Sequence, residues 1–349
     1  MAITWNRQGC EQPIHVSGRV VIDTDAFNRF SGMRARPVAP FKIGDISKLG
    51  HQTVPKEGSK RIKLTPDYQM LCTPRLRGYS IKLKKWLDFF VDNVSEIQWN
   101  DHAFENLVLD EQQKDLILSF TESQVANNAG FDDVIQGKGK GIVILLSGSP
   151  GIGKTLTAEA VAECMRVPLH TITSGELGSE AYTLESQLSS ALGIVSQWNA
   201  ILLLDEADVF LEARSAHDLK RNQIVSIFLR TLEYYEGILF MTTNRVNNID
   251  EAFQSRIHVS LEYPGLNDTS RRKIWTNIAN SRQHSFTERD FDELATIDLN
   301  GRQIKNVLKT AHLLASRRRQ LLDRKVVDVV LAIEKRRPGV GKNLTSGSD

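Results

Sequence analysis

The sequence has no long hydrophobic run and few cysteines, and its charges nearly cancel. No stretch of about 18 apolar residues occurs, and the first 20 residues lack both a signal-peptide core and an Arg-rich transit pattern. Its three cysteines, Cys10, Cys72 and Cys164, are too few and too far apart for a disulfide framework or a metal cluster. A formal net charge of +2 gives no bulk attraction to nucleic acid or anionic lipid. We therefore expect an intracellular protein, cytoplasmic or nuclear, with no membrane span and without nucleic acid as a partner.

The N-terminal third of the chain predicts an accessory region. Residues 1 to about 80 mix short β-like stretches with loops rich in Gly, Pro and basic residues. Between Tyr79 and Asn128 the apolar spacing favours helix, with apolar faces formed by Trp86, Phe89, Phe90 and Val91 and then by Leu116, Ile117 and Phe120. We expect an N-terminal accessory region over residues 1–100.

The rest of the chain has the pattern of an α/β domain followed by helices. From Gly141 onward, short apolar runs alternate with helical segments, at residues 142–146, 169–172, 201–204, 238–242 and 259–261. Such runs are typical of a parallel sheet that is buried on both faces. After Pro264 the sequence is helical to about Lys335 and ends in a Gly/Ser-containing tail. We expect an α/β core over 101–263, a helical region over 264–337 and a disordered tail over 338–349.

One segment has the pattern G-x-x-x-x-G-K-[ST], and it stands between an apolar run and a helical stretch. Its glycines let backbone N–H groups surround phosphates at a helix N-terminus, the lysine reaches the β- and γ-phosphates, and the threonine hydroxyl binds Mg²⁺. A chance match is expected in roughly one chain in a hundred of this length, so a plain Gly-rich turn is the weaker alternative. The predicted phosphate-binding residues are Gly148, Ser149, Pro150, Gly151, Ile152, Gly153, Lys154, Thr155 and the adjoining Leu156.

Two carboxylates follow the run 201–204, about 50 residues after this loop. The carboxyl ends of parallel strands face the ligand crevice, so Asp205 can hold Mg²⁺ together with Thr155, and Glu206 can polarise an attacking water. Acidic residues also follow strands as simple solvated turn residues. The combination with the phosphate-binding loop favours the catalytic interpretation.

Two further polar residues flank apolar runs, and each has an ordinary alternative. Asn244 follows the run 238–242 and can orient a water beside the γ-phosphate, or can simply occupy a turn. Arg256 precedes the run 259–261 and can reach a neighbouring subunit's nucleotide, or can form a surface salt bridge.

Taken together, these motifs resemble the AAA ATPase family. The likeness rests on Gly148 to Thr155, Leu203 to Asp208, Thr242 to Asn244 and Ala252 to Arg256. It implies a P-loop NTPase parallel sheet with a C-terminal helical lid, and the binding and hydrolysis of Mg-ATP. It also implies a homo-oligomer, expected to be a hexameric ring, that remodels an unidentified protein or protein complex.

The resemblance assigns a role to each candidate residue. It makes Lys154 and Thr155 the Walker A pair, Asp205 and Glu206 the Walker B pair, Asn244 the first sensor and Arg256 the arginine finger. The second sensor begins near Asn300-Gly-Arg302, and Arg302 is as readily an ordinary helix-start arginine.

Other stretches refine this resemblance. Phe131 to Gly141, Leu232 to Ile238 and Arg19 to Asp23 are similar to fungal AAA-like proteins that carry an N-terminal domain of unknown function. The segment Gly175 to Thr183 departs from the family, because it is polar and acidic where protein-threading members have an aromatic-hydrophobic-glycine triplet. Whether the chain threads peptides by an aromatic grip therefore stays open.

Two other functions stay open. A nucleic-acid motor or loader would need a basic channel, but the basic runs 317–319 and 335–337 are better interpreted as a solvated helix face. An ATP-gated scaffold with little turnover would not need Glu206, which this chain retains.

Overall fold

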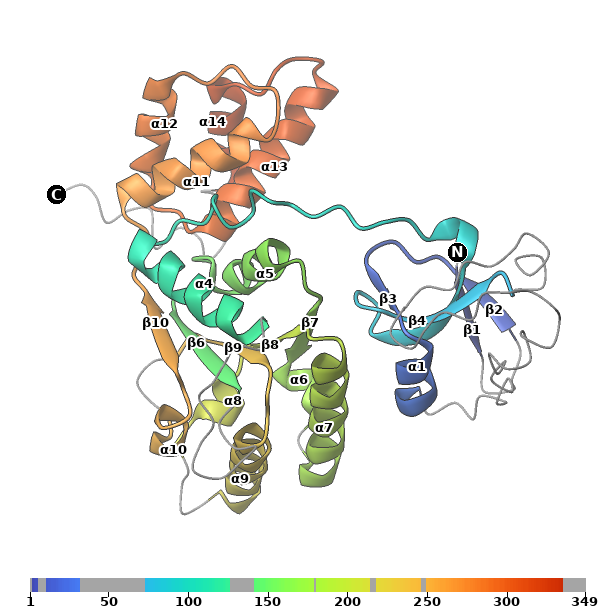
Figure 1. The fold of residues 1–349 in the computed structure, drawn as a ribbon. Helices are drawn as coiled ribbons and strands as arrows, with labels where there is room; N and C mark the ends of the chain where they lie inside the picture. Colours follow the sequence, from blue (N-terminus) through green and yellow to red (C-terminus); the bar gives the residue numbers. More distant parts are fainter. Residues whose placement is uncertain are drawn as a thin grey trace. The chain divides into compact units, whose positions relative to one another are not determined.

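The chain forms two compact units, Met1–Gln98 and Trp99–Asp349, in the computed structural model of Figure 1. The structure describes residues 2–5, 11–31, 73–125, 141–178, 180–213, 218–245 and 249–334. The stretch 131–140 that contributes to the fungal resemblance, the basic run 335–337 and the predicted tail 338–349 lie outside the described residues. Within the described part, none of the helices combines the length and hydropathy needed to cross a membrane.

The first unit is built on a five-stranded antiparallel sheet with strand order β2-β1-β5-β4-β3. Its elements are β1 (Ala2–Trp5), β2 (Glu11–Ile14), β3 (Val20–Ile22), α1 (Thr24–Phe30), β4 (Arg75–Ser80), β5 (Lys85–Phe90) and the 3₁₀ turn η1 (Val91–Asn93). Ala2, Leu87 and Phe89 form its buried core.

The helix predicted from the aromatic residues that follow Tyr79 is wrong. Trp86, Phe89 and Phe90 lie on strand β5. Phe89 belongs to the buried core, whereas Trp86 packs edge-on against Phe27 and Tyr79, at ring distances of 5.8 and 5.0 Å. Because apolar residues cover both faces of β5, the alternation that marks a strand is absent, and the spacing imitates one face of a helix.

The second half of that prediction is confirmed, since α4 (Glu111–Val125) is a helix with Ile117 fully buried. It belongs to the second unit, whose sheet is parallel, with strand order β10-β6-β9-β8-β7. All five apolar runs are strands: β6 (Ile142–Gly148), β7 (Leu169–Thr173), β8 (Ile201–Asp205), β9 (Ile238–Thr243) and β10 (Val259–Tyr263).

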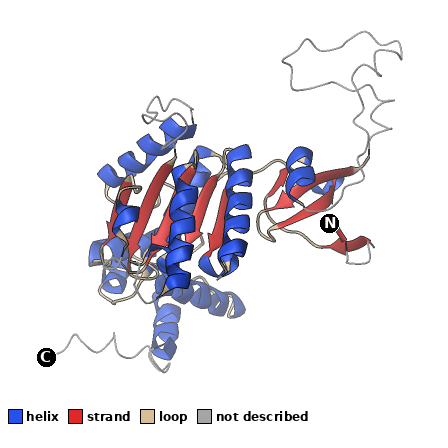
Figure 2. Cartoon of the chain, turned by 90° about the horizontal axis from the view of Figure 1, so that it is seen from below, coloured by secondary structure: helices blue, strands red, loops and turns tan. Residues whose placement is uncertain are grey.

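Helices cover both faces of this sheet, as Figure 2 shows. On β6, Ile142, Ile144 and Leu146 share one core with α4 and α5 (Lys154–Met165). Val143 and Leu145 share the opposite core with α7 (Ala181–Gln197) and α9 (Leu219–Glu233). The short helices are α6 (Ser174–Leu177), α8 (Asp208–Leu211) and α10 (Glu251–Gln254). The predicted α/β class is confirmed.

The C-terminal helices form a bundle with a core of its own. They are α11 (Asp268–Asn280), α12 (Glu288–Ala295), α13 (Gly301–Arg317) and α14 (Arg324–Glu334). Trp275 and Ile304 are fully buried at its centre. The side chains of Asn267, Thr287 and Asn300 each accept a backbone N–H at the start of α11, α12 and α13, which fixes where these helices begin. The predicted helical region is present.

Candidate functional site

The loop between β6 and α5 is shaped by glycines. Gly148, Gly151 and Gly153 have φ angles of +136°, +79° and +116°, in the region that residues with a side chain avoid. A Cβ on Gly148 would also lie 2.6 Å from the Tyr263 carbonyl oxygen. The loop ends at Gly153, which is the N-cap residue of α5. The free N–H groups at the N-terminus of this helix favour an anion.

Lys154 is the first residue of α5, directly after this loop, and it is only 7% exposed. Its Nζ donates to the carbonyl oxygens of Gly148 and Ser149, both at 2.8 Å, and to Asn244 Oδ1 at 2.9 Å. Burial lowers the pKa of Lys154, whereas the nearby charges of Asp205 and Asp208 act in the opposite direction. The lysine and the asparagine that the sequence placed 90 residues apart are thus in direct contact.

The acidic pair lies at the carboxyl end of β8. Thr155 Oγ1 donates to Asp205 Oδ1 at 3.1 Å, and Thr242 Oγ1, on the adjacent strand β9, donates to the same oxygen at 2.5 Å. A hydroxyl and a carboxylate side by side are oxygen ligands of the kind that Mg²⁺ takes. The residues present therefore fit this ion.

Glu206 differs from its neighbour in conformation and exposure. Its φ of +57° is left-handed, its side chain is exposed, and its backbone N–H donates to Thr242 Oγ1 at 3.0 Å. The next acidic residue, Asp208, accepts from the hydroxyl of Thr243 and from the backbone N–H of Asn244 at 3.1 Å.

Sequence reasoning gave no role to Thr242 or Asp208, although both lie inside the motifs. No spacing rule singles out a hydroxyl on the strand beside an acidic pair, because its contact partner is set by the pairing of β8 with β9. The signal that was available is the position of each residue, two or three places from a predicted site residue.

The C-terminal helical region contacts the loop through the start of α13. Gly151 O accepts from the Arg302 backbone N–H at 3.2 Å, and a Cβ on Gly151 would lie 2.8 Å from Asn300 Oδ1. The charge of Arg302 is near enough to add to the lowering of the Lys154 pKa. Arg302 thus lies beside the loop, and the second-sensor role that the resemblance implies for it stays a prediction.

Arg256 lies at the other end of the sheet. Its Nη1 donates to the carbonyl oxygen of Ala252 at 2.9 Å, and its Nη2 lies 4.0 Å from Glu233 Oε2 at the end of α9. Strand β10 runs parallel to β6, with Tyr263 opposite Gly148 and Val259 opposite Ile144. Because Arg256 precedes β10 and the loop follows β6, the strand separates them, and Figure 1 shows α10 at the far end of β10 from the helical region.

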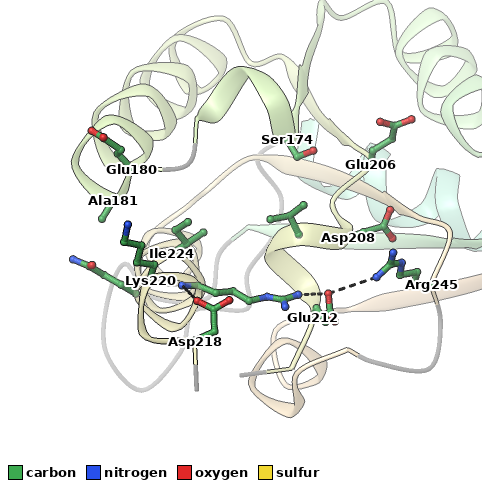
Figure 3. A pocket seen from close by; sticks show the side chains of 13 residues that line it. Ser174, Glu180, Ala181, Glu206, Asp208, Glu212, Asp218, Lys220, Ile224 and Arg245 are labelled. Atoms are coloured by element: carbon green, nitrogen blue, oxygen red, sulfur yellow. Dashed lines mark hydrogen bonds and ion pairs between the residues drawn. The ribbon is translucent and has the colours of Figure 1, made fainter. Parts of the chain in front are cut away.

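A pocket of about 890 Å³ opens beside Glu206, as Figure 3 shows. Glu212 pairs with Arg221 from α9, and its Oε2 lies 3.7 Å from Arg245 Nη1, just after Asn244. Glu206 and Asp208 also line this pocket. Glu212 therefore pairs with one arginine from α9 and with a second arginine just after β9.

Comparison with known proteins gives one matching family. Residues 144–264 match the family described as "ATPase family associated with various cellular activities (AAA)". The chain is 29% identical to the "Mitochondrial sorting homolog" of Caenorhabditis elegans over 180 residues, and this alignment covers 48% of this chain and 52% of that protein. It is 29% identical over 199 residues to the "26S proteasome regulatory subunit 4 homolog" of Schizosaccharomyces pombe, covering 51% and 43%.

A third relative is "Spastin" of Dictyostelium discoideum, 31% identical over 164 residues that cover 44% of this chain and 25% of that protein. The chain thus spans about half the length, or less, of these curated relatives. The family match over residues 144–264 contains the loop, the acidic pair, Asn244 and Arg256.

Proposed function

We propose that this chain, which carries an AAA ATPase domain over residues 144–264, binds and hydrolyses Mg-ATP in a homo-oligomeric ring and so remodels a protein or protein complex. The observation that carries the proposal is the contact of Lys154 with Asn244, beside the Thr155–Asp205 hydrogen bond, where the loop meets α5. Motif residues from three strands converge there, and each has the chemistry that phosphoryl transfer uses.

Binding is assigned to the loop and its helix, residues Gly148 to Leu156. The three oxygens that now accept from Lys154 are positioned so that phosphate oxygens can replace them as acceptors. Thr155 and Asp205 would hold Mg²⁺, whose charge offsets that of the phosphates when it is bound. Arg302, at the start of α13, is placed to bring a second positive charge from the lid.

Hydrolysis is assigned to Glu206 and Asn244. The exposed carboxylate of Glu206 can polarise a water and take its proton, since it is not engaged with Thr155 as Asp205 is. Asn244 Oδ1 already accepts from Lys154, and this contact supports a role for the Asn244 amide in orienting the attacking water.

The ring is proposed because Arg256 is too far from its own loop. Strand β10 has five residues, so its first and last Cα atoms are about 13 Å apart. The loop faces one end and Arg256 precedes the other, so Arg256 serves a neighbouring subunit if it serves a nucleotide at all. A hexamer, a protein client and an intracellular location in cytoplasm or nucleus complete the proposal.

The proposed function is tested by two variants that separate binding from hydrolysis. Lys154→Ala should weaken ATP binding, because the charged contact to the phosphates is removed. Glu206→Gln should bind ATP with the affinity of the unmodified chain and fail to hydrolyse it, since only the water-polarising group has changed. Calorimetric binding and phosphate release are measured on all three proteins.

Equal ATP affinity in Lys154→Ala and the unmodified chain would contradict the site. Loss of binding in Glu206→Gln would show that its role is misplaced. ATP binding without measurable turnover in the unmodified chain would favour the ATP-gated scaffold instead.

A further inference from the structure

We propose that Thr242 is a positioning residue that holds both acidic residues of the site, Asp205 and Glu206, in the geometry that hydrolysis needs. The inference rests on the proposed function, in which these two carboxylates hold the metal and polarise the water. It adds a residue to which neither motif spacing nor family resemblance gave a role.

Three hydrogen bonds from this one residue hold three successive residues of the neighbouring strand end. Thr242 Oγ1 donates to Asp205 Oδ1 at 2.5 Å and accepts from the Glu206 backbone N–H at 3.0 Å. The Thr242 carbonyl oxygen accepts from the Ala207 backbone N–H at 2.8 Å. Thr242 is only 2% exposed, so water does not compete for these contacts.

These contacts explain how Glu206 keeps an unfavourable backbone conformation. A φ of +57° is left-handed, which residues other than glycine, asparagine and aspartate rarely adopt. Such a conformation persists where surrounding contacts fix it, and it is common at functional sites. Here the hydroxyl and the carbonyl of Thr242 bind the N–H groups of Glu206 and Ala207, the two residues that form the turn.

The turn separates the two carboxylates. Asp205 accepts from Thr155 of the phosphate-binding loop, whereas Glu206 is one of the residues that line the pocket in Figure 3. One carboxylate is thereby held at the predicted metal position, and the other stays exposed for a water. Loss of the turn would let Glu206 change direction without changing its chemistry.

A threonine hydroxyl suits this position because it donates and accepts at the same time. Valine has nearly the same shape but can do neither, whereas serine can do both. The pair of substitutions Thr242→Val and Thr242→Ser therefore separates the hydrogen bonds from the packing.

The first measurement is steady-state ATP hydrolysis. Thr242→Val should lower kcat by about 10- to 100-fold, the usual effect of losing a group that orients a metal ligand or a catalytic residue. The KM for ATP should change much less, because the phosphate-binding loop is intact. Thr242→Ser should recover most of the lost kcat.

Thr121→Val is the matched control. Thr121 is also fully buried in the same unit, and its hydroxyl donates to the Ile117 carbonyl oxygen at 2.9 Å within α4. This variant loses a buried hydroxyl hydrogen bond away from the site, so its kcat should equal that of the unmodified chain. A fall as large as that of Thr242→Val would overturn the proposal in favour of a general loss of stability.

The second measurement is independent of turnover. In the nucleotide-free protein, the Glu206 amide hydrogen should exchange with solvent faster in Thr242→Val than in the unmodified chain, and equally fast in Thr121→Val. Unchanged exchange at Glu206, or a kcat within about twofold of the unmodified chain, would overturn the positioning role. An unmodified chain that fails to hydrolyse ATP would instead count against the proposed function, while the exchange measurement still decides the role of Thr242.

Discussion

Lys154 and Tyr263 show how single residues of the loop region balance burial against polarity. Burial disfavours the charge on Lys154, and three oxygen acceptors with two nearby carboxylates offset part of that effect. Tyr263 lies at the end of β10, and its hydroxyl is 2.6 Å from Thr157 Oγ1 on α5. Each is buried where a polar group needs a partner, and each has one.

Tyr263 gives a prediction at alkaline pH. Burial raises the pKa of Tyr263 to about 12, and the hydrogen bond with Thr157 opposes that shift. Because the pKa is raised in the folded state, the contribution to stability is complete below the ordinary value of 10.0 and is lost as the pH rises from 10 toward 12. The loss amounts to about 3 kcal/mol at most.

Urea unfolding of Tyr263→Phe and the unmodified chain, compared from pH 8 upward, checks this value. The free energy of unfolding should fall more steeply above pH 10 in the unmodified chain, because the variant has no phenol there to ionise. Tyr182→Phe, at an 86% exposed position, should run parallel to the unmodified chain. Parallel curves for Tyr263→Phe as well would refute the pKa shift.

At the scale of elements, the sequence predicts well where burial produces a simple pattern. Strands β6, β8 and β9 were found because each is an apolar run that is buried on both faces, as β6 is between the cores of α5 and α7. Strand β5 was missed because aromatic residues on both faces removed the alternation. The nearness of Lys154 and Asn244 could be predicted, because both follow neighbouring parallel strands. The contacts of Thr242 could not, because they depend on the register of β8 with β9.

The contact between α13 and the loop leads to a prediction about the lid. Gly151→Ala would place a Cβ 2.8 Å from Asn300 Oδ1 and would strain a backbone whose φ is +79°. We expect the start of α13 to move away from the loop, so the Arg302 amide, which donates to Gly151 O, should exchange faster with solvent. Amide hydrogen exchange in the nucleotide-free protein measures this.

Gly153→Ala is the control for strain alone. Gly153 has a φ of +116°, and a Cβ there would meet nothing within 4 Å. This variant should be destabilised by about 1–3 kcal/mol and leave the Arg302 amide as protected as before. Adding Asn300→Gly to Gly151→Ala should restore part of the protection, since glycine is tolerated as a helix cap. Equal exchange at Arg302 in both alanine variants would show that the clash with Asn300 has no role.

At the scale of the whole molecule, the resemblance to AAA ATPases is confirmed by the match over residues 144–264, and the domain limits and site roles stay predictions. The position of Arg256 could not be derived from its motif alone. It follows from the parallel pairing of β10 with β6. Arg256 precedes β10 and the phosphate-binding loop follows β6, so the two lie at opposite ends of these strands. The chain therefore has the proposed nucleotide site at one end of this sheet and the candidate activating arginine at the other.

This separation predicts that two inactive variants restore activity when mixed. Arg256→Ala alone should bind ATP and lose hydrolysis by ~10³-fold, as expected for an arginine finger, and Glu206→Gln alone should be equally inactive. In a mixed oligomer, an Arg256→Ala subunit keeps its own Glu206 and can receive Arg256 from a Glu206→Gln neighbour. Phosphate release from the mixture, measured across mixing ratios, should exceed the sum of the two separate proteins and peak at an intermediate ratio.

The mixing experiment distinguishes a shared site from a self-contained one because of where the two defects lie. If Arg256 acted on the nucleotide of its own subunit, every subunit in the mixture would lack either Glu206 or Arg256 at its own site, and no ratio would restore turnover. A mixture of Glu206→Gln with Lys154→Ala is the control, and it should stay inactive. Glu206 and Lys154 both serve the nucleotide site of their own subunit, so a neighbour cannot replace either of them. A rescue confined to the first mixture, under conditions where labelled subunits exchange, supports an active site built from two chains, and an inactive first mixture under those conditions excludes it.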